Sequence, residues 1–172
     1  MPIYLHPTVI EAKDLREFGI CLSSPTFGFG VDTQYGFLRM IHRGGFDAFP
    51  NLKIILGHLV KHYLLQQIEL MLYIVKDMDN HYLNIEGYYS KEPEYYIRHN
   101  LWTTSSGNYL PQELYCTRDV LVKEKVIMVT DHPYEKIELG VDMIKEDDSL
   151  TDEEKELYLY KNAKALGFGK NI

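Results

Sequence analysis

Three side chains of the types that hold metals and move protons stand directly after short apolar segments of this chain. They are His6 after residues 2–5, His58 after residues 49–57, and Asp131 after residues 126–130. Because the carboxyl ends of parallel strands meet at one edge of a sheet, these three side chains are expected to converge. Two imidazoles and a carboxylate suit a divalent metal such as zinc or manganese. The alternative for His58 is a histidine that only completes the packing of a core or a turn.

The segment that precedes His58 is the strongest strand candidate in the sequence. It reads Phe-Pro-Asn-Leu-Lys-Ile-Ile-Leu-Gly-His over residues 49–58, and its apolar run does not alternate with polar residues. Such a run is typical of a strand covered on both faces, as parallel strands are. Three further strands are predicted, at residues 2–6, 101–104 and 126–130. The first should end at His6, because Pro7 has no N–H to donate to a central ladder.

Helical patterns separate these strands. Apolar spacing and capping residues predict helices near residues 33–43, 63–76, 111–120 and 151–166. Residues 8–31 show little periodicity, which predicts a long loop with one helical turn near residues 11–17. Residues 80–96, which contain five tyrosines, are expected to form surface and a short helix. The alternation of strands and helices predicts an α/β fold of four βα units, in a single domain over residues 1–172.

The composition restricts the possible partners. With 45% hydrophobic and 25% charged residues, the chain fits a globular domain, and its formal net charge of -7 argues against binding a nucleic-acid backbone. Cys21 and Cys116 have no CxxC spacing that would suggest a disulfide framework or a zinc knuckle. No apolar run approaches the roughly 20 residues that span a bilayer. A cytoplasmic protein without a membrane or nucleic-acid partner is therefore expected.

Five motifs carry a resemblance to a known family. They are Tyr-Leu-His-Pro at residues 4–7, the segment 46–58, Thr-Thr-Ser-Ser-Gly-Asn at 103–108, Val-Thr-Asp-His-Pro-Tyr-Glu at 129–135, and Asn-Ala at 162–163 before Leu166. In this order they resemble the amidohydrolase-related decarboxylases, the group of aminocarboxymuconate-semialdehyde decarboxylase and γ-resorcylate (2,6-dihydroxybenzoate) decarboxylase. The motifs cover nearly the whole chain.

The resemblance implies a metal-dependent (β/α)8 barrel with its site at the carboxyl ends of the strands. It implies that His6 and Asp131 are metal ligands, on the family's fifth and eighth strands, and that Asp131 is also an acid or base. It implies that His58 lies beside the metal and assists proton transfer or holds the substrate carboxylate. The implied reaction is non-oxidative decarboxylation of a hydroxylated aromatic or unsaturated carboxylic acid, without an organic cofactor.

The chain departs from the family pattern in two ways. A (β/α)8 barrel needs about 250 residues, so the four βα units correspond to its carboxyl-terminal half, without the strand-one metal motif. Lys61 stands where the family usually has a Glu that pairs with the histidine, and a cation there opposes metal binding. His62 and His132 are close in sequence to the site, and each is expected to be a solvated loop histidine.

Three functional classes remain open. The chain could be a catalytic half-barrel completed by an amino-terminal half or by a second copy, a truncated member that binds a ligand or metal without turnover, or a structural remnant. Hydrolysis of a lactone or amide is the alternative reaction. Because four βα units leave exposed sheet edges, a homo-oligomer or a complex with a complementary half is expected. The isolated chain is expected to bind zinc or manganese weakly and to be inactive, since a proton donor without a fully held metal lacks most of the electrostatic stabilisation.

Overall fold

The computed structural model describes residues 1–25, 27–58, 89–107 and 109–169. The helix expected at residues 63–76 lies outside these ranges, and so do Lys61 and His62. Among the described residues, no helix is both long and apolar enough to cross a bilayer.

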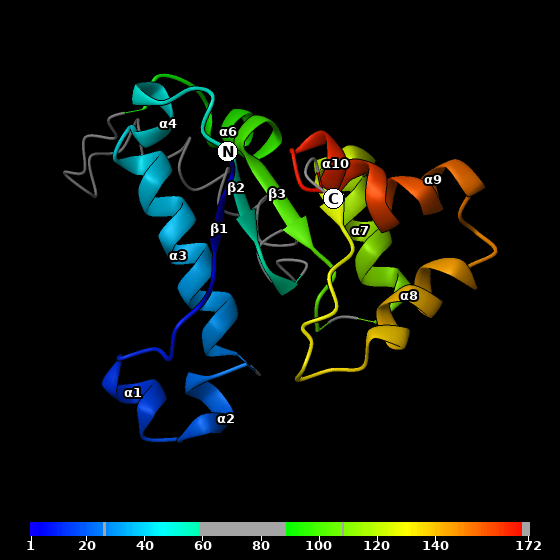
Figure 1. Ribbon diagram of the computed structural model, residues 1–172. Helices are drawn as coiled ribbons and strands as arrows, with labels where there is room; N and C mark the ends of the chain where they lie inside the picture. The colour runs from blue at the N-terminus through cyan, green and yellow to red at the C-terminus, as the bar shows by residue number, and fades with distance from the viewer. Residues whose placement is uncertain (26, 59–88, 108, 170–172) are drawn as a thin grey trace. The chain divides into compact units, whose positions relative to one another are not determined.

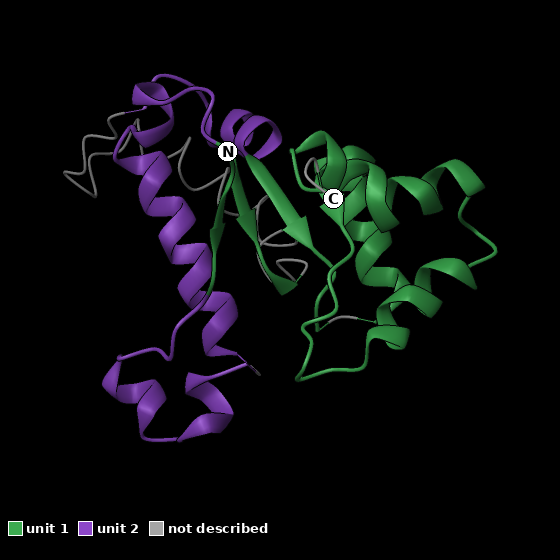
Figure 2. Ribbon diagram, in the orientation of Figure 1, with its two compact units in different colours: residues 1–6, 53–60, 101–172 green, residues 7–52, 61–100 purple. Residues whose placement is uncertain are grey.

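The chain divides into two compact units (Figure 2). Unit 1 comprises Met1–His6, Lys53–Val60 and Leu101–Ile172, and unit 2 comprises Pro7–Leu52 and Lys61–Asn100. His6, His58 and Asp131 all belong to unit 1. The expectation of a single domain stays a prediction.

A four-stranded parallel sheet forms the centre of unit 1. Its strands are β1 (Ile3–Leu5), β2 (Ile54–Leu56), β3 (Leu101–Thr104) and β4 (Val126–Ile127), paired in chain order (Figure 1). The predicted fold class is confirmed, and the four strands lie where the sequence placed them. The fourth strand is shorter than predicted, because only its first two residues pair with β3.

The strands differ in how well they are covered. Every residue of β2, β3 and β4 is buried, as the absence of polar alternation predicted for β2. In β1, by contrast, Ile3 is 51% exposed and Tyr4 is 42% exposed. The first strand is therefore the open side of the sheet.

Two apolar clusters lie on opposite faces of β4, because successive residues of a strand point to opposite faces. One cluster gathers around Val126, and its other buried members are Leu114, Ile144, Leu150 and Tyr158. The second gathers around Ile127, and its other buried members are Ile55, Trp102 and Leu166. The paired residues Tyr4, Ile55 and Trp102 stand side by side across three strands, so this second face is shared by the sheet.

The helices of unit 1 follow β3 and β4. They are α7 (Pro111–Leu121), the 3-10 turn η2 (Lys123–Lys125), α8 (Ile137–Lys145), α9 (Asp152–Glu156), the π-helical segment η3 (Leu157–Lys161) and α10 (Asn162–Ala165). Thr151 caps α9 in a capping box with Glu154, which confirms the predicted start of the last helical stretch. The sequence did not predict α8.

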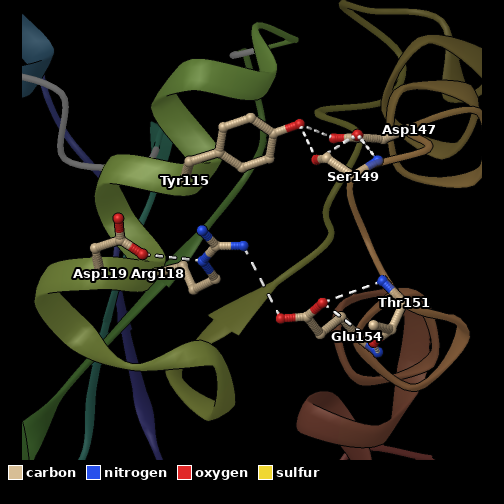
Figure 3. Close-up of polar contacts among 7 residues, drawn as sticks. All are labelled: Tyr115, Arg118, Asp119, Asp147, Ser149, Thr151 and Glu154. Carbon is tan, nitrogen blue, oxygen red and sulfur yellow. Dashed lines mark hydrogen bonds and ion pairs between the residues drawn. The ribbon is translucent and has the colours of Figure 1, made fainter.

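Polar side chains tie α7 to the segment that joins α8 and α9 (Figure 3). The Tyr115 hydroxyl donates to the Asp147 carboxylate and lies 2.6 Å from the Ser149 hydroxyl. Arg118 of the same helix faces Glu154, with 3.9 Å between Nη1 and Oε1 (Figure 3). These contacts hold together the helical layer that covers the Val126 cluster.

The segments η3 and α10 also form hydrogen bonds with the outer edge of β4 and with η2. The buried Asn162 side chain donates two hydrogen bonds from Nδ2, to the carbonyl oxygens of Lys123 at 2.8 Å and Val126 at 2.7 Å. The N–H of Met128 donates to the carbonyl oxygen of Tyr158 at 3.0 Å. Backbone groups that an outer strand would otherwise present to a partner are thus satisfied here within the chain.

Unit 2 is helical. Its described helices are α1 (Lys13–Arg16), α2 (Ile20–Ser23), α3 (Gly28–His42), α4 (Gly45–Ala48) and α6 (Pro93–Asn100). The helical turn predicted near residues 11–17 is confirmed as α1, but the long loop expected over the rest of residues 8–31 is wrong, because α2 and the start of α3 also lie in this range. Gly28, which reads as a helix breaker in the sequence, is required here because a Cβ would lie 2.5 Å from the backbone of Ser23.

Candidate functional site

His6 stands directly after β1, at the position that the sequence predicted. Its side chain is exposed, and Pro7 after it is buried. The strand that presents His6 is the half-exposed β1. The structure therefore places this imidazole at the carboxyl end of the sheet, on its least covered strand.

His58 follows β2 and has an unusual backbone conformation. Its φ is 63°, in the left-handed region that non-glycine residues rarely adopt. The preceding Gly57 is closely approached, since a Cβ there would lie 2.8 Å from the Tyr4 hydroxyl oxygen. The left-handed turn interrupts the alternation of the strand and sets the direction of the imidazole.

The imidazole of His58 lies against the backbone of the loop that follows β3. A Cβ at Gly107 would lie only 2.6 Å from His58 Nδ1, and the φ of Gly107 is 69°. Glycine is needed at this position for two reasons, the close approach of the ring and the left-handed backbone. The Gly of the Ser-Ser-Gly-Asn motif thus allows the His58 imidazole to pack against the backbone at this position.

Hydroxyl groups fill the carboxyl end of β3. Thr104, Ser105 and Ser106 are all buried, and the Thr104 and Ser106 hydroxyls are 3.0 Å apart. Ser105 continues the pairing with β4: its N–H donates to the Ile127 carbonyl at 3.0 Å, and its Oγ accepts from the Val129 N–H at 3.3 Å. The run of four hydroxyl residues marked this end as polar, but its part in holding the segment before Asp131 did not follow from the sequence.

Asp131 begins a tight turn after β4. Its φ is 54°, again left-handed, and its carbonyl oxygen accepts from the N–H groups of Tyr134 at 2.9 Å and Glu135 at 3.4 Å. Asp residues tolerate the left-handed region better than most because their short polar side chain bonds locally. His132, the neighbour of Asp131, is exposed, in keeping with a solvated loop residue.

Tyr109 is a functional candidate that sequence reasoning missed. It lies between β3 and α7, and its hydroxyl donates to the Thr130 carbonyl oxygen at 3.3 Å. Burial, followed by the hydrogen bond to Glu135 and that residue's charge, raises the pKa of Tyr109 to about 12. The hydroxyl therefore keeps its proton at neutral pH and acts as a hydrogen-bond donor beside Asp131.

The donor set fits a divalent metal in kind but is small. An imidazole and a carboxylate, from His6 and Asp131, are the groups that bind manganese or zinc. Within the residues that the structure describes, no group of three or more His, Cys, Asp or Glu side chains could hold a metal ion. Close contacts bring His58 to Gly107 and Tyr109 to the Asp131 turn, while His6 follows the strand at the opposite end of the sheet from β4.

Comparison with known proteins gives a consistent result. The amidohydrolase family model matches residues 1–166. Decarboxylase orsB of Emericella nidulans is 31% identical over 177 residues, which cover 96% of this chain and 52% of that protein.

Two solved structures share the fold. The structure of 5-carboxyvanillate decarboxylase LigW from Sphingomonas paucimobilis has a TM-score of 0.85 at 26% identity and covers 96% of this chain and 49% of that chain. Dihydroxybenzoic acid decarboxylase from Polaromonas, with bound manganese and the inhibitor 2-nitroresorcinol, has a TM-score of 0.84 at 26% identity, covering 96% and 49%. The chain thus spans about half the length of the relatives that it matches.

Proposed function

The chain belongs to the amidohydrolase family, and we propose that it is the carboxyl-terminal half of a metal-dependent decarboxylase that acts on hydroxylated aromatic carboxylic acids. The observation that carries the proposal is the parallel sheet with strand order β1-β2-β3-β4, because His6, His58 and Asp131 follow β1, β2 and β4 and so stand at the same edge of it. Two relatives that share the fold, which are named as decarboxylases of 5-carboxyvanillate and of dihydroxybenzoic acid, support the proposal.

The proposed roles follow from the chemistry of each side chain. His6 and Asp131 hold a divalent metal, manganese or zinc, with further ligands from outside the described residues. When bound, such an ion supplies positive charge that orients the carboxylate and adjacent phenolic oxygen of the substrate. Asp131 or His58 delivers the proton to the ring carbon that bears the carboxylate, and carbon dioxide then leaves as the ring regains its aromaticity.

The structure supports these proposed roles because neighbouring residues hold the side chains of His58 and Asp131 in place. His58 is held by its contact with Gly107, and Asp131 by its turn and by the neighbouring Tyr109. Side chains that transfer protons must be held close to the productive geometry, because small displacements reduce the rate strongly. Both of the proposed proton-transfer residues have neighbours within the chain that restrict their movement.

A complementary half is part of the proposal. The exposed β1, and the small number of metal donors among the residues that the structure describes, support an assembly with a segment equivalent to the amino-terminal half of the relatives, or with a second copy of this chain. A ligand-binding subunit without turnover is a second candidate function, and the observation that favours it is the same small donor set.

The test is an assay of carbon dioxide release from 2,6-dihydroxybenzoate with manganese or zinc added. The chain is assayed alone and mixed with the amino-terminal half of a γ-resorcylate decarboxylase. We expect no turnover by the chain alone and metal-dependent turnover by the mixture, abolished in Asp131→Asn. Turnover by the chain alone would contradict the need for a second half, and inactivity of every combination would favour the subunit without turnover.

A further inference from the structure

The Tyr109 hydroxyl lies where the two loops that carry the candidate proton-transfer groups meet. It contacts the carbonyl oxygen of Thr130, the residue directly before Asp131, at 3.3 Å. The backbone of Gly107 also interacts with this hydroxyl and acts to lower the pKa of Tyr109, which is the effect of an N–H that faces the hydroxyl oxygen. Gly107 is the residue against which His58 Nδ1 packs. One hydroxyl group therefore links Gly107, against which His58 packs, to the turn that begins at Asp131.

Two further contacts fix the Tyr109 ring itself. The Glu135 carboxylate, at the end of the Asp131 turn, raises the pKa of the same hydroxyl as an acceptor, so it shares the single hydroxyl hydrogen with the Thr130 carbonyl oxygen. On α8, a Cβ at Gly140 would lie 3.3 Å from Tyr109 Cε1, so the ring packs closely on the helix backbone. The ring is thus held on one side by the helix and at its tip by the two loops.

The loops need such support because of their backbone conformation. Both His58 and Asp131 have left-handed φ values, 63° and 54°, which residues with a Cβ adopt only when their surroundings impose them. A hydroxyl that donates on one side and accepts on the other is suited to this task. Removing it would leave the Gly107 N–H without its acceptor and the Thr130 carbonyl without its donor.

We propose that Tyr109 is a positioning residue that holds the Asp131 turn in register with the His58 imidazole, by bridging the Gly107 N–H and the Thr130 carbonyl. The inference rests on the proposed function, because that function makes Asp131 and His58 the proton-transfer groups. Its physical content, the linkage of two loops, is measurable without any activity.

The experiment compares Tyr109→Phe with a matched control, Tyr115→Phe. Tyr115 belongs to the same unit and also loses a hydroxyl that is hydrogen-bonded, to Asp147 and Ser149, but it lies in the helical layer (Figure 3). Amide hydrogen exchange is measured by NMR at Gly107 and Asp131. We expect exchange at both amides to be about tenfold faster in Tyr109→Phe, in line with the loss of one hydrogen bond, and unchanged in Tyr115→Phe.

A second readout is the affinity for Mn²⁺ alone, followed by electron paramagnetic resonance. Substitution of a residue that orients a metal ligand typically lowers the metal affinity by about 10-fold or more. Tyr109→Phe should therefore weaken Mn²⁺ binding, and Tyr115→Phe should not. Equal exchange at Gly107 in wild type and Tyr109→Phe, or equal acceleration in both variants, would overturn the positioning role. A wild-type chain that binds no Mn²⁺ even with the complementary half would contradict the proposed function, and the exchange at Gly107 would still decide the role of Tyr109.

Discussion

The two outer strands of the sheet, β1 and β4, each precede a proposed metal ligand, but they differ in how well the rest of the chain covers them. On β4, Val126 is 1% exposed, and the strand's outer edge is closed by the Asn162 side chain. On β1, Ile3 is 51% exposed. The segment before Asp131 is therefore well supported by the chain itself, whereas the strand before His6 is only partly covered.

The largest effect is expected from breaking the closure of β4. Asn162→Leu keeps the volume but removes both hydrogen bonds from Nδ2, which leaves two carbonyl oxygens without their donor. We expect a loss of about 3 kcal/mol in the free energy of unfolding, measured by urea denaturation. Asn100→Leu is the matched control in unit 2, because this buried side chain also donates to two carbonyl oxygens, those of Pro50 and Leu52.

The two asparagine variants separate local from general damage. Both should destabilise the protein, but only Asn162→Leu should speed amide exchange at Met128 and Asp131. Equal exchange at Asp131 in both variants would show that the closure of β4 does not support the site.

Gly107→Ala tests the support of His58 and should have the next largest effect. The new Cβ meets His58 Nδ1 and is added at a φ of 69°, so we expect a loss of about 2 kcal/mol. Gly167→Ala is the control, because its φ of 98° is also positive but no atom lies within 4 Å of the added Cβ. The control should cost only about 1 kcal/mol and leave the His58 ring resonances unchanged in NMR spectra. A change of the His58 resonances in Gly167→Ala, or none in Gly107→Ala, would argue against the contact.

The strands and the site differ in how far they could be predicted. Unalternated apolar runs and Pro7 were enough to locate the four strands and to place His6, His58 and Asp131 at their ends, because both features are local. The left-handed conformations of His58 and Asp131 could not be foreseen, since neither is a glycine. The role of Tyr109 depends on contacts with Thr130, which is 21 residues away in the sequence.

The helices show the same limit. α8 contains Gly140, which lowers helix propensity, and its place in the helix is explained by the Tyr109 ring that packs against it. Asn162 belongs to a recognisable family motif, but its hydrogen bonds to η2 and to the start of β4 form only when residues 39 and 36 positions apart come together.

A smaller and pH-dependent effect is expected in the helical layer behind β4. The backbone hydrogen bond from Thr151, followed by its side-chain bond and the charge of Arg118, lowers the pKa of Glu154 below its ordinary 4.5 despite partial burial (Figure 3). A carboxyl group with a lowered pKa stabilises the fold above its unfolded pKa and loses this contribution as the pH falls through the folded pKa. Glu154→Gln should therefore cost about 1 kcal/mol at pH 7 and nothing in strong acid.

Thermal unfolding measured over a series of pH values checks this prediction. Glu153→Gln, an exposed neighbour in the same helical turn, is the control and should change little at any pH. If Glu154→Gln lowers the thermal stability by the same amount at acidic pH as at pH 7, packing and not charge is responsible.

The smallest change in the free energy of unfolding is expected for a substitution on β1, and it tests the difference in burial between β1 and β4. Ile3→Thr alters a residue that is half exposed, so the free energy of unfolding of the chain alone should change by less than about 0.5 kcal/mol. Val126→Thr places a hydroxyl in the buried cluster of β4 and should cost about 2 kcal/mol. Equal losses from the two substitutions, measured by urea denaturation, would remove the distinction between the strands.

The most direct test of the account is hydrogen exchange measured by mass spectrometry before and after adding the amino-terminal half of a family decarboxylase. In the chain alone we expect fast exchange in the peptide of residues 1–6 and slow exchange in that of residues 126–131. Addition of the second half should protect residues 1–6 strongly and change residues 126–131 little. A first strand already as protected as the fourth, or equal protection of both on addition, would contradict the claim that this chain builds the Asp131 side of the site itself and relies on another segment for the His6 side.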